Sequence, residues 1–362
     1  MNNNVYIVQP YLSMKGHYRQ YFENLLFINY RYVYCDVADR YYKNSFFIKT
    51  YSKDCEKNFL KFILCRLINS YKVYQFLKQQ IKDNDLIHLI EFEPFNFILF
   101  ELSTYLKKKK IIITIHSIDS MHYQNKIKNF IALFQRIVYR FGLKLAKRKK
   151  YNFVVHYKIH KKQLQKIVGK DAIINVIEYP SPPIKIDKPK TLKSKRLLIF
   201  GQIREDKGFY EFLSQELSKK LFITIAGKIY DNRINSLKKH VSYKFIDKFI
   251  DDKELKKLFF EHDFLLLPYS KKYSGGAGPL KDSFAYGMPV ITTNIPIFKE
   301  IIDTYRTGFY FNNIYELSTI LKRISHKIYL DYSKNCIKYA YNHGWNYMRN
   351  EYFKLYKHLI DC

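Results

Sequence analysis

The residues with the clearest chemistry lie between Tyr269 and Thr293, in the stretch YSKKYSGGAGPLKDSFAYGMPVITT. An apolar run at 264–267 precedes it, a glycine-rich turn follows, and Pro279 opens a helical pattern that Gly287 closes. Proline just inside a helix and glycine just past its end are typical of helix boundaries. The pattern predicts strand, glycine loop, helix and strand, with helix N–H groups at an edge of a sheet where anions bind. An ordinary glycine-rich turn would have the same local pattern.

A second turn of this kind has the sequence GQIREDKG and spans residues 201–208, directly after the predicted strand 196–200. It places Arg204 and Lys207 beside the start of the next helical pattern. A guanidinium binds phosphate oxygens through two donors, and an ammonium adds a mobile point charge. Two such turns in one domain suit the diphosphate of a nucleotide.

Strand and helix patterns alternate along the whole chain, which predicts an α/β fold with mainly parallel sheets. The first strand, 5–8, leads into Gly16 and His17 without a GxGxxG motif, so we expect no dinucleotide site there. Further patterns in the first half predict strands at 85–90, 110–116 and 152–155 and helices at 59–81, 95–107 and 161–168.

The proline- and lysine-rich segment 181–196 interrupts this alternation and predicts a linker. We therefore expect Rossmann-like domains at 1–180 and 197–344. The helical pattern 345–362 either completes the second domain or packs back on the first.

The net charge is +31, and such a charge attracts polyanions such as nucleic acid, acidic membranes or phosphorylated small molecules. Lysine-rich codon usage on a solvated surface is the other explanation. The five cysteines have no CxxC spacing, which argues against a zinc site or disulfide framework. The start of the chain has no secretory pattern, and no run reaches the ~18 apolar residues of a membrane span.

Longer segments resemble retaining glycosyltransferases of the GT-B fold, family 4. FGQIREDKG is similar to the family's G-R-x-x-x-x-K-G turn, and FAYGMPVITTN to its A-x-A-x-G-x-P-V-I-A-S segment. The D-x-I-H at 85–88, the T-x-H at 114–116 and Gly16-His17 fit the N-terminal half. The resemblance implies two Rossmann-like domains facing across a cleft, a nucleotide-diphosphate sugar as donor and no metal or other cofactor.

The sequence departs from the family at one position. The family has two glutamates eight residues apart, and here Ser274 and Asp282 stand in their places. The resemblance implies that Asp282 holds the donor ribose, whereas Ser274 cannot provide the charge that contacts the transferred sugar. The implied donor-binding residues are Gly16, His17, Ser274, Gly275, Gly276, Ala277, Gly278, Pro279, Leu280 and Asp282.

The resemblance also implies a substrate-assisted reaction, in which a donor phosphate oxygen takes the acceptor proton. Arg204 and Lys207 would then stabilise the departing diphosphate electrostatically. His116, in the T-x-H segment, would lie near the transferred sugar, with Asp119 as a residue that could orient it. His88, inside an apolar strand, is interpreted as a core histidine. Glu91 and Glu93 fit either an acceptor site or a solvated strand end.

Residues 126–170 contain many Lys and Arg residues and no Asp or Glu. Phe130, Phe134, Ile137, Phe141 and Leu145 repeat at helical spacing beside a basic stripe. Such a helix lies either on anionic lipid or with its apolar stripe in a domain core. The basic stripe, a candidate membrane or acceptor surface, consists of Arg136, Arg140, Lys144 and Lys147.

The sequence therefore predicts a glycosyltransferase acting on a glycan or lipid-linked acceptor in surface polysaccharide synthesis. We expect it in the cytoplasm, with the inner face of the plasma membrane as an additional location. One alternative is a basic nucleic-acid-binding protein, although no motif of that class is present. The other is a catalytically silent GT-B partner subunit, which the serine at 274 favours.

Overall fold

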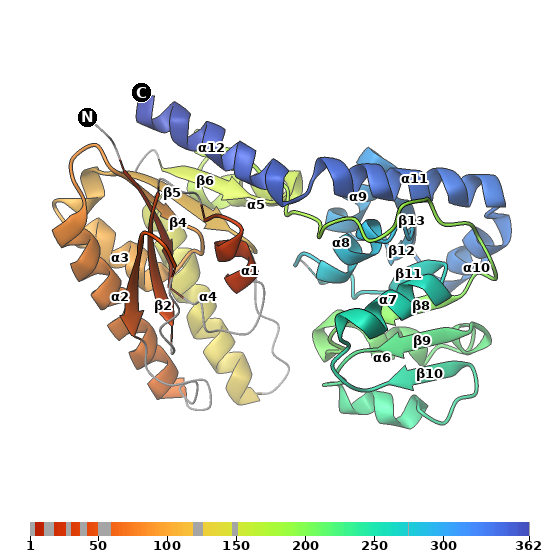
Figure 1. The fold of residues 1–362 in the computed structure, drawn as a ribbon. Helices are drawn as coiled ribbons and strands as arrows, with labels where there is room; N and C mark the ends of the chain where they lie inside the picture. The colour runs from red at the N-terminus through yellow and green to blue at the C-terminus, as the bar shows by residue number, and fades with distance from the viewer. Residues whose placement is uncertain are drawn as a thin grey trace. The chain divides into compact units, whose positions relative to one another are not determined.

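The computed structural model describes residues 4–10, 18–26, 30–36, 42–49, 59–118, 126–146, 151–273 and 275–361. The chain divides into two compact units. Unit 1 comprises Met1–Met121, Asn125–Glu178 and Met348–Cys362, and unit 2 comprises His122–Gln124 and Tyr179–Tyr347. Each unit is built around its own parallel sheet (Figure 1).

Unit 1 contains a seven-stranded sheet with the order β3-β2-β1-β4-β5-β6-β7, in which every pairing is parallel. Its first six strands follow the order of a doubly wound nucleotide-binding sheet. The strands are β1 (Val5–Gln9), β2 (Arg31–Asp36), β3 (Ser45–Lys49), β4 (Leu86–Leu89), β5 (Lys110–Ile115), β6 (Asn152–Val155) and β7 (Ile173–Val176). The helices are α1 (Tyr18–Glu23), α2 (Phe59–Gln80), α3 (Pro94–Leu102), α4 (Lys126–Ala146), α5 (Lys158–Val168) and α12 (Trp345–Asp361), which begins in unit 2.

Alternate residues of the unit 1 strands point to opposite faces of the sheet. Ile87 and Leu89 belong to an apolar core with Phe97 of α3 and Leu164 of α5. Between them, His88 faces the other side, where α12 packs.

Unit 2 contains a six-stranded parallel sheet with the order β10-β9-β8-β11-β12-β13. The strand order again matches a doubly wound sheet, so the structure confirms the predicted α/β class with two Rossmann-like parallel sheets. The strands are β8 (Leu197–Phe200), β9 (Ile223–Ala226), β10 (Tyr243–Ile246), β11 (Phe264–Leu267), β12 (Val290–Thr293) and β13 (Gly308–Phe311). The helices are α6 (Phe209–Leu213), α7 (Asp252–Glu261), α8 (Gly278–Ala285), α9 (Pro296–Tyr305), α10 (Ile314–Arg323) and α11 (His326–Asn342).

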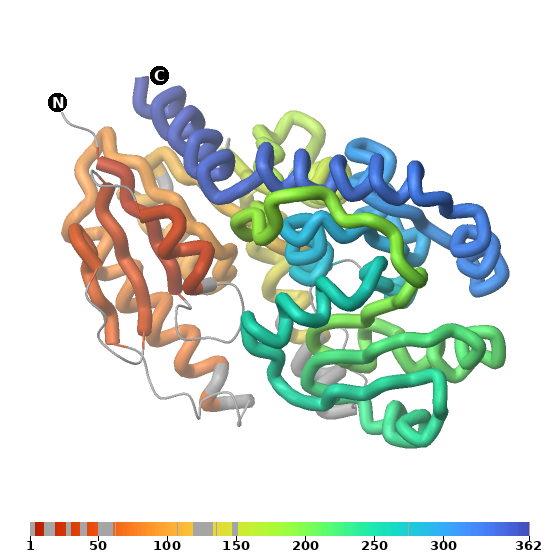
Figure 2. The backbone as a smooth tube through the Cα atoms, turned by 45° about the vertical axis from the view of Figure 1, so that its right-hand side comes forward, coloured from red at the N-terminus to blue at the C-terminus, as the bar shows by residue number. Residues whose placement is uncertain are grey.

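The proline-rich segment 181–196 has no helix or strand, yet it is held along unit 2. The Lys190 N–H donates to the Ser333 hydroxyl on α11 at 2.8 Å, and the Lys185 N–H donates to the Ala285 carbonyl at 2.8 Å. The Asp263 carboxylate accepts from the N–H groups of Lys193 and Ser194 at 3.0 Å each. Figure 2 traces the segment alongside α11. These contacts make it part of unit 2 rather than a free spacer.

Tyrosines attach α12 to unit 1. The Tyr356 hydroxyl lies 2.5 Å from His88 Nδ1, and the Tyr352 hydroxyl lies 2.8 Å from both the Thr114 and the Tyr21 hydroxyls. His88 Nε2 in turn contacts the Thr114 hydroxyl at 2.8 Å, and the imidazole is fully buried. The interpretation of His88 as a core histidine is confirmed. Burial lowers the pKa of His88 to about 3, so the ring stays neutral.

Tyr356→Phe should destabilise unit 1, because it leaves His88 Nδ1 buried without its partner. A lost partner of a buried polar group costs about 1–3 kcal/mol. Denaturant unfolding followed by circular dichroism measures the loss, and hydrogen exchange of the β4 amides localises it to unit 1. Tyr341→Phe is the matched control, since Tyr341 is 78% exposed and should change little. Equal midpoints for the two variants would contradict the assigned role of the hydroxyl.

Candidate functional site

The turn between β8 and α6 is shaped by two glycines. Gly201 has φ 109° and Gly208 has φ 76°, a region that side-chain-bearing residues rarely adopt. Between them, the Arg204 guanidinium makes a two-pronged ion pair with the Asp206 carboxylate, at 3.0 and 2.9 Å. The Arg204 side chain stays 43% exposed, so the guanidinium is both oriented and accessible.

Lys207 is buried beneath this turn. Its Nζ donates to the Gln202 carbonyl at 3.0 Å and lies 5.1 Å from the ring centre of Tyr269. Burial lowers the pKa of Lys207 to about 7; Arg204 lowers it further, while Asp206 opposes the shift. A bound anion would therefore raise the charged fraction of this ammonium.

The two predicted anion turns lie against each other. A Cβ added to Gly201 would lie 3.0 Å from Cγ of Pro279, and the Ser270 N–H donates to the Lys207 carbonyl at 2.8 Å. The turn with Arg204 and Lys207 thus contacts both ends of the glycine loop, within one compact unit.

The glycine loop leads into α8, whose first turn contains Pro279 as predicted. The Tyr273 hydroxyl donates to the Gly276 carbonyl at 2.9 Å. Within the described residues, nothing accepts a hydrogen bond from the N–H groups of Gly275, Gly276, Ala277 or Gly278. Such amides at a helix N-terminus bind anions.

Asp282 lies further along α8 and is half-buried. Burial raises its pKa to about 7; Asp252 adds to the shift, and Lys185 opposes it. Leu280, predicted to bind donor, is 1% exposed and its N–H donates to the Ala277 carbonyl, so it supports the loop from within the core. Ser274 lies outside the described residues, as do Gly16, His17, Asp119 and Lys147.

His116 lies at the carboxyl end of β5 in unit 1, and its side chain is 24% exposed. Its Nε2 lies 2.9 Å from the Ile90 carbonyl and its Nδ1 lies 2.7 Å from Nε2 of His156. Sequence reasoning missed His156, although a signal existed. Both residues follow a β-branched run directly, and β5 and β6 pair Ile115 with Val155.

The two glutamates after β4 are not a solvated strand end. Glu93 is 1% exposed, caps α3 by accepting from the Phe95 N–H, and pairs with Arg66 through contacts of 3.0 and 2.9 Å. This carboxylate is structural, and the acceptor role considered for it is wrong. Glu91 is 18% exposed and its Oε2 lies 3.5 Å from His116 Nε2.

The apolar stripe of α4 is exposed at three of its described positions and packs on the core at a fourth. Phe134, Ile137 and Phe141 are 38%, 58% and 52% exposed, whereas Leu145 is half-buried against the apolar core of unit 1. The interpretation of the stripe as core is therefore wrong for these three residues. The described cations of the basic stripe, Arg136, Arg140 and Lys144, are exposed beside them.

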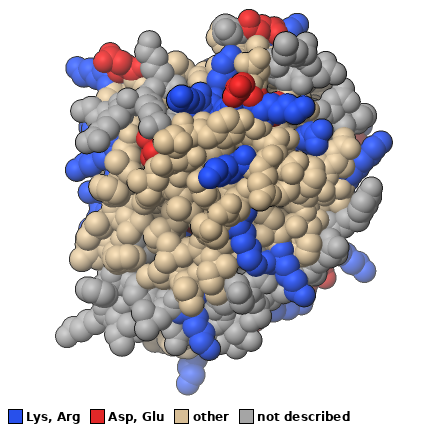
Figure 3. All heavy atoms as spheres, turned by 90° about the vertical axis from the view of Figure 1, so that its left-hand side faces the viewer, with Lys and Arg blue, Asp and Glu red and all other residues tan. Residues whose placement is uncertain are grey.

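Basic side chains also occur on other surfaces. Figure 3 views the molecule from the left-hand side of Figure 1 and shows Lys and Arg around a broad uncharged area, with few acidic side chains. Of the helices in the described ranges, none is long and apolar enough to cross a membrane. The same residues contain no group of three or more His, Cys, Asp or Glu placed to hold a metal ion.

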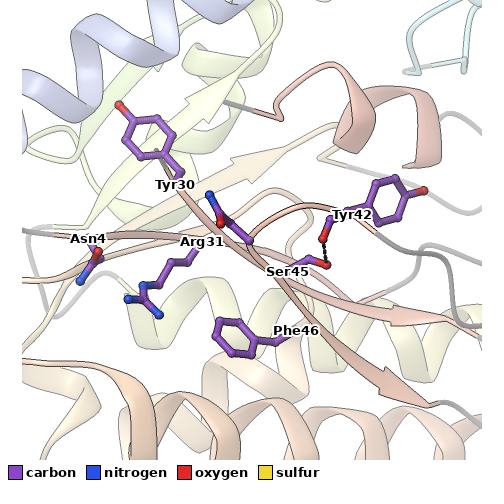
Figure 4. A pocket seen from close by; sticks show the side chains of 7 residues that line it. Asn4, Tyr30, Arg31, Tyr42, Ser45 and Phe46 are labelled. Atoms are coloured by element: carbon purple, nitrogen blue, oxygen red, sulfur yellow. Dashed lines mark hydrogen bonds between the residues drawn. The ribbon is translucent and has the colours of Figure 1, made fainter. Parts of the chain in front are cut away.

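A separate cavity of about 380 Å³ lies at the amino ends of β1, β2 and β3 in unit 1 (Figure 4). It is therefore at the opposite edge of the sheet from His116. The sequence contains no signal for it, because its residues are common types brought together by strand order. They are Asn4, Tyr30, Arg31, Tyr42, Asn44, Ser45 and Phe46.

Residues 181–343 match the family model described as glycosyl transferases group 1. No curated protein matches the chain in sequence. The matched range covers most of unit 2, including both anion turns, Arg204, Lys207 and Asp282.

Solved structures resemble the chain over nearly its whole length. Sucrose-phosphate synthase (tll1590) from Thermosynechococcus elongatus has 14% identity and a TM-score of 0.70, covering 99% of this chain and 100% of that chain. A glycosyltransferase from Rickettsia africae ESF-5 has 15% identity and a TM-score of 0.66, covering 99% of each chain. Anabaena Alr3699/HepE, solved with UDP and glucose, has 12% identity and a TM-score of 0.67, covering 98% of this chain and 100% of that chain. At these identities the likeness shows the fold, which is GT-B.

Gly208→Ala should destabilise unit 2, because the new Cβ would lie 3.0 Å from the Ser270 backbone nitrogen at a positive φ. The left-handed conformation alone costs a residue with a side chain about 1–2 kcal/mol. Denaturant unfolding measures the change. Gly344→Ala is the matched control, since its nearest neighbour is a carbonyl oxygen 3.5 Å away. A Gly208→Ala protein as stable as this control would refute the proposed close approach of the two turns.

Proposed function

We propose that the protein is a retaining glycosyltransferase, because residues 181–343 match the glycosyl transferases group 1 model and the whole chain has the GT-B fold. It transfers a sugar from a nucleotide-diphosphate donor to a glycan or lipid-linked acceptor in surface polysaccharide synthesis. The observation that carries the proposal is the contact between the Arg204–Lys207 turn and the glycine loop before α8.

A diphosphate fits the chemistry of this place. The N–H groups of Gly275 to Gly278 and the positive end of α8 favour negative charge. Arg204 offers a planar pair of donors and Lys207 a buried ammonium. The similar HepE structures contain UDP or UDP-glucose, which supports a donor of this class.

In the proposed reaction the sugar–phosphate bond breaks and the diphosphate leaves with added negative charge. Arg204 is oriented by Asp206 before donor binds, which limits the reorganisation needed in the transition state. Lys207 takes up a proton as the diphosphate approaches, because the anion offsets the cost of burying its charge. Asp282 holds the ribose hydroxyls, and no metal or other cofactor takes part.

The reaction needs no protein base, because a donor phosphate oxygen accepts the acceptor proton. His116 acts on the transferred sugar from unit 1. The serine at 274 leaves the sugar without the carboxylate contact that the family has, so the loop amides take over this contact. This substitution makes the sugar preference the property to measure first.

The test is turnover and binding across a panel of nucleotide-diphosphate sugars. Arg204→Ala and Lys207→Met should each lower turnover by about 10²–10³, the usual effect of removing one electrostatic donor. Lys322→Ala, which removes an exposed cation on α10, is the control and should match the parent protein. Binding without any turnover would favour the silent partner subunit. Neither binding nor turnover, together with salt-dependent binding of DNA or RNA, would favour the nucleic-acid alternative.

We propose further that α4 lies on an anionic membrane. Its exposed Phe134, Ile137 and Phe141 would enter the lipid boundary, with Arg136, Arg140 and Lys144 beside the headgroups. Each cation near such a surface contributes about 1 kcal/mol.

Changing Arg136, Arg140 and Lys144 together to Gln should therefore lower partition onto phosphatidylglycerol vesicles by about two orders of magnitude. Vesicle sedimentation measures the partition. The control changes three exposed lysines of α7, Lys253, Lys256 and Lys257, to Gln and should have a much smaller effect. Parent protein that stays in the supernatant, or equal losses in both triple variants, would exclude this surface.

A further inference from the structure

Three ionisable side chains meet at the carboxyl ends of adjacent strands in unit 1. Glu91 follows β4, His116 follows β5 and His156 follows β6, and the three strands pair side by side. His156 is 1% exposed, so its ring interacts with protein rather than with solvent.

The hydrogen bonds of the two rings fix the number of protons they share. His156 Nδ1 lies 2.8 Å from the Ile177 carbonyl, and His116 Nε2 lies 2.9 Å from the Ile90 carbonyl. A carbonyl only accepts, so each of these nitrogens must carry a proton. The remaining contact, 2.7 Å between His116 Nδ1 and His156 Nε2, needs a third proton between the rings.

Two neutral imidazoles carry one proton each, so three protons give the pair one positive charge. The Glu91 carboxylate can balance this positive charge, because its Oε2 lies 3.5 Å from His116 Nε2. That oxygen is buried and accepts no hydrogen bond from any described residue. Burial raises the pKa of Glu91 to about 8 and Arg66 lowers it; a neighbouring imidazolium would lower it further.

We propose that His156 is a positioning residue that, together with Glu91, keeps His116 protonated, so that unit 1 presents a cation to the substrate and not a general base. The inference rests on the proposed transferase function and sets the role of His116 within it. A cation at this position attracts the negative charge of a donor phosphate or a phosphorylated acceptor. It also agrees with a reaction in which the donor itself accepts the proton.

Among the described residues, three other titratable side chains near the pair have different roles. Tyr21 of α1 packs edge-on against His116 at 4.7 Å between ring centres, and its hydroxyl bonds to Tyr352. His88 of β4 stays neutral. Arg66 of α2 lowers the pKa of Glu91 through its charge.

The test is nitrogen NMR of the full chain labelled at its 11 histidines, with His116 assigned through a His116→Gln variant. At pH 7.5 both His116 nitrogens should have imidazolium shifts. In His156→Phe, and separately in Glu91→Gln, His116 should give up its proton at least one pH unit lower, a tenfold change in the proton equilibrium. Tyr21→Phe perturbs the same packing and should leave the titration unchanged.

A neutral His116 at pH 7.5 in the parent protein would overturn the proposal, as would a titration that neither His156→Phe nor Glu91→Gln moves. If one variant fails to fold, the spectrum of the parent protein and the titration of the other variant still test the proposal. Once a donor is known, the alkaline limb of kcat should shift down by at least one pH unit in His156→Phe. If no nucleotide sugar is turned over, that result counts against the transferase function. The NMR titration tests the protonation of His116 independently of turnover.

Discussion

The geometry of unit 2 depends on a backbone approach that only glycine permits. A Cβ on Gly227 would lie 2.0 Å from the Gly201 carbonyl oxygen, so the ends of β8 and β9 could not come together with larger residues. Gly208 makes a similar approach to Ser270. These approaches hold the cation-bearing turn against the end of β11 and place the Lys207 ammonium beside the Tyr269 ring. The position of the Lys207 charge in the site thus depends on glycines, which have no side chain to prevent these close approaches.

The sequence predicts this part of the chain well because local signals determine it. The apolar run of β11, Pro279 and Gly287 define a strand, a helix start and a helix end within a short window. Other strands were missed for a physical reason. β2 is RYVYCD and β13 is GFYF, so aromatic and polar residues replace the β-branched runs by which buried parallel strands are recognised.

The candidate site in unit 1 shows the limit of sequence reasoning more clearly. His116 was identified through a short motif, but its properties depend on His156 and Glu91, far away in the chain. Only the parallel register of β4, β5 and β6 brings the three together. The exposed stripe of α4 is a related case, because an apolar helix face has the same spacing whether it meets a core or another partner.

The position of α12 has a consequence for how the protein is made. The chain leaves unit 1 near Glu178, builds all of unit 2, and only then returns with Met348 to complete unit 1. During synthesis on the ribosome, the sheet of unit 1 is therefore exposed on the α12 face until the whole of unit 2 has been translated. His88 and Thr114 have no helix tyrosine to bond in that interval. Although unit 1 begins first, unit 2 is the earlier of the two to be complete, and a nascent unit 1 is the one that keeps an uncovered face.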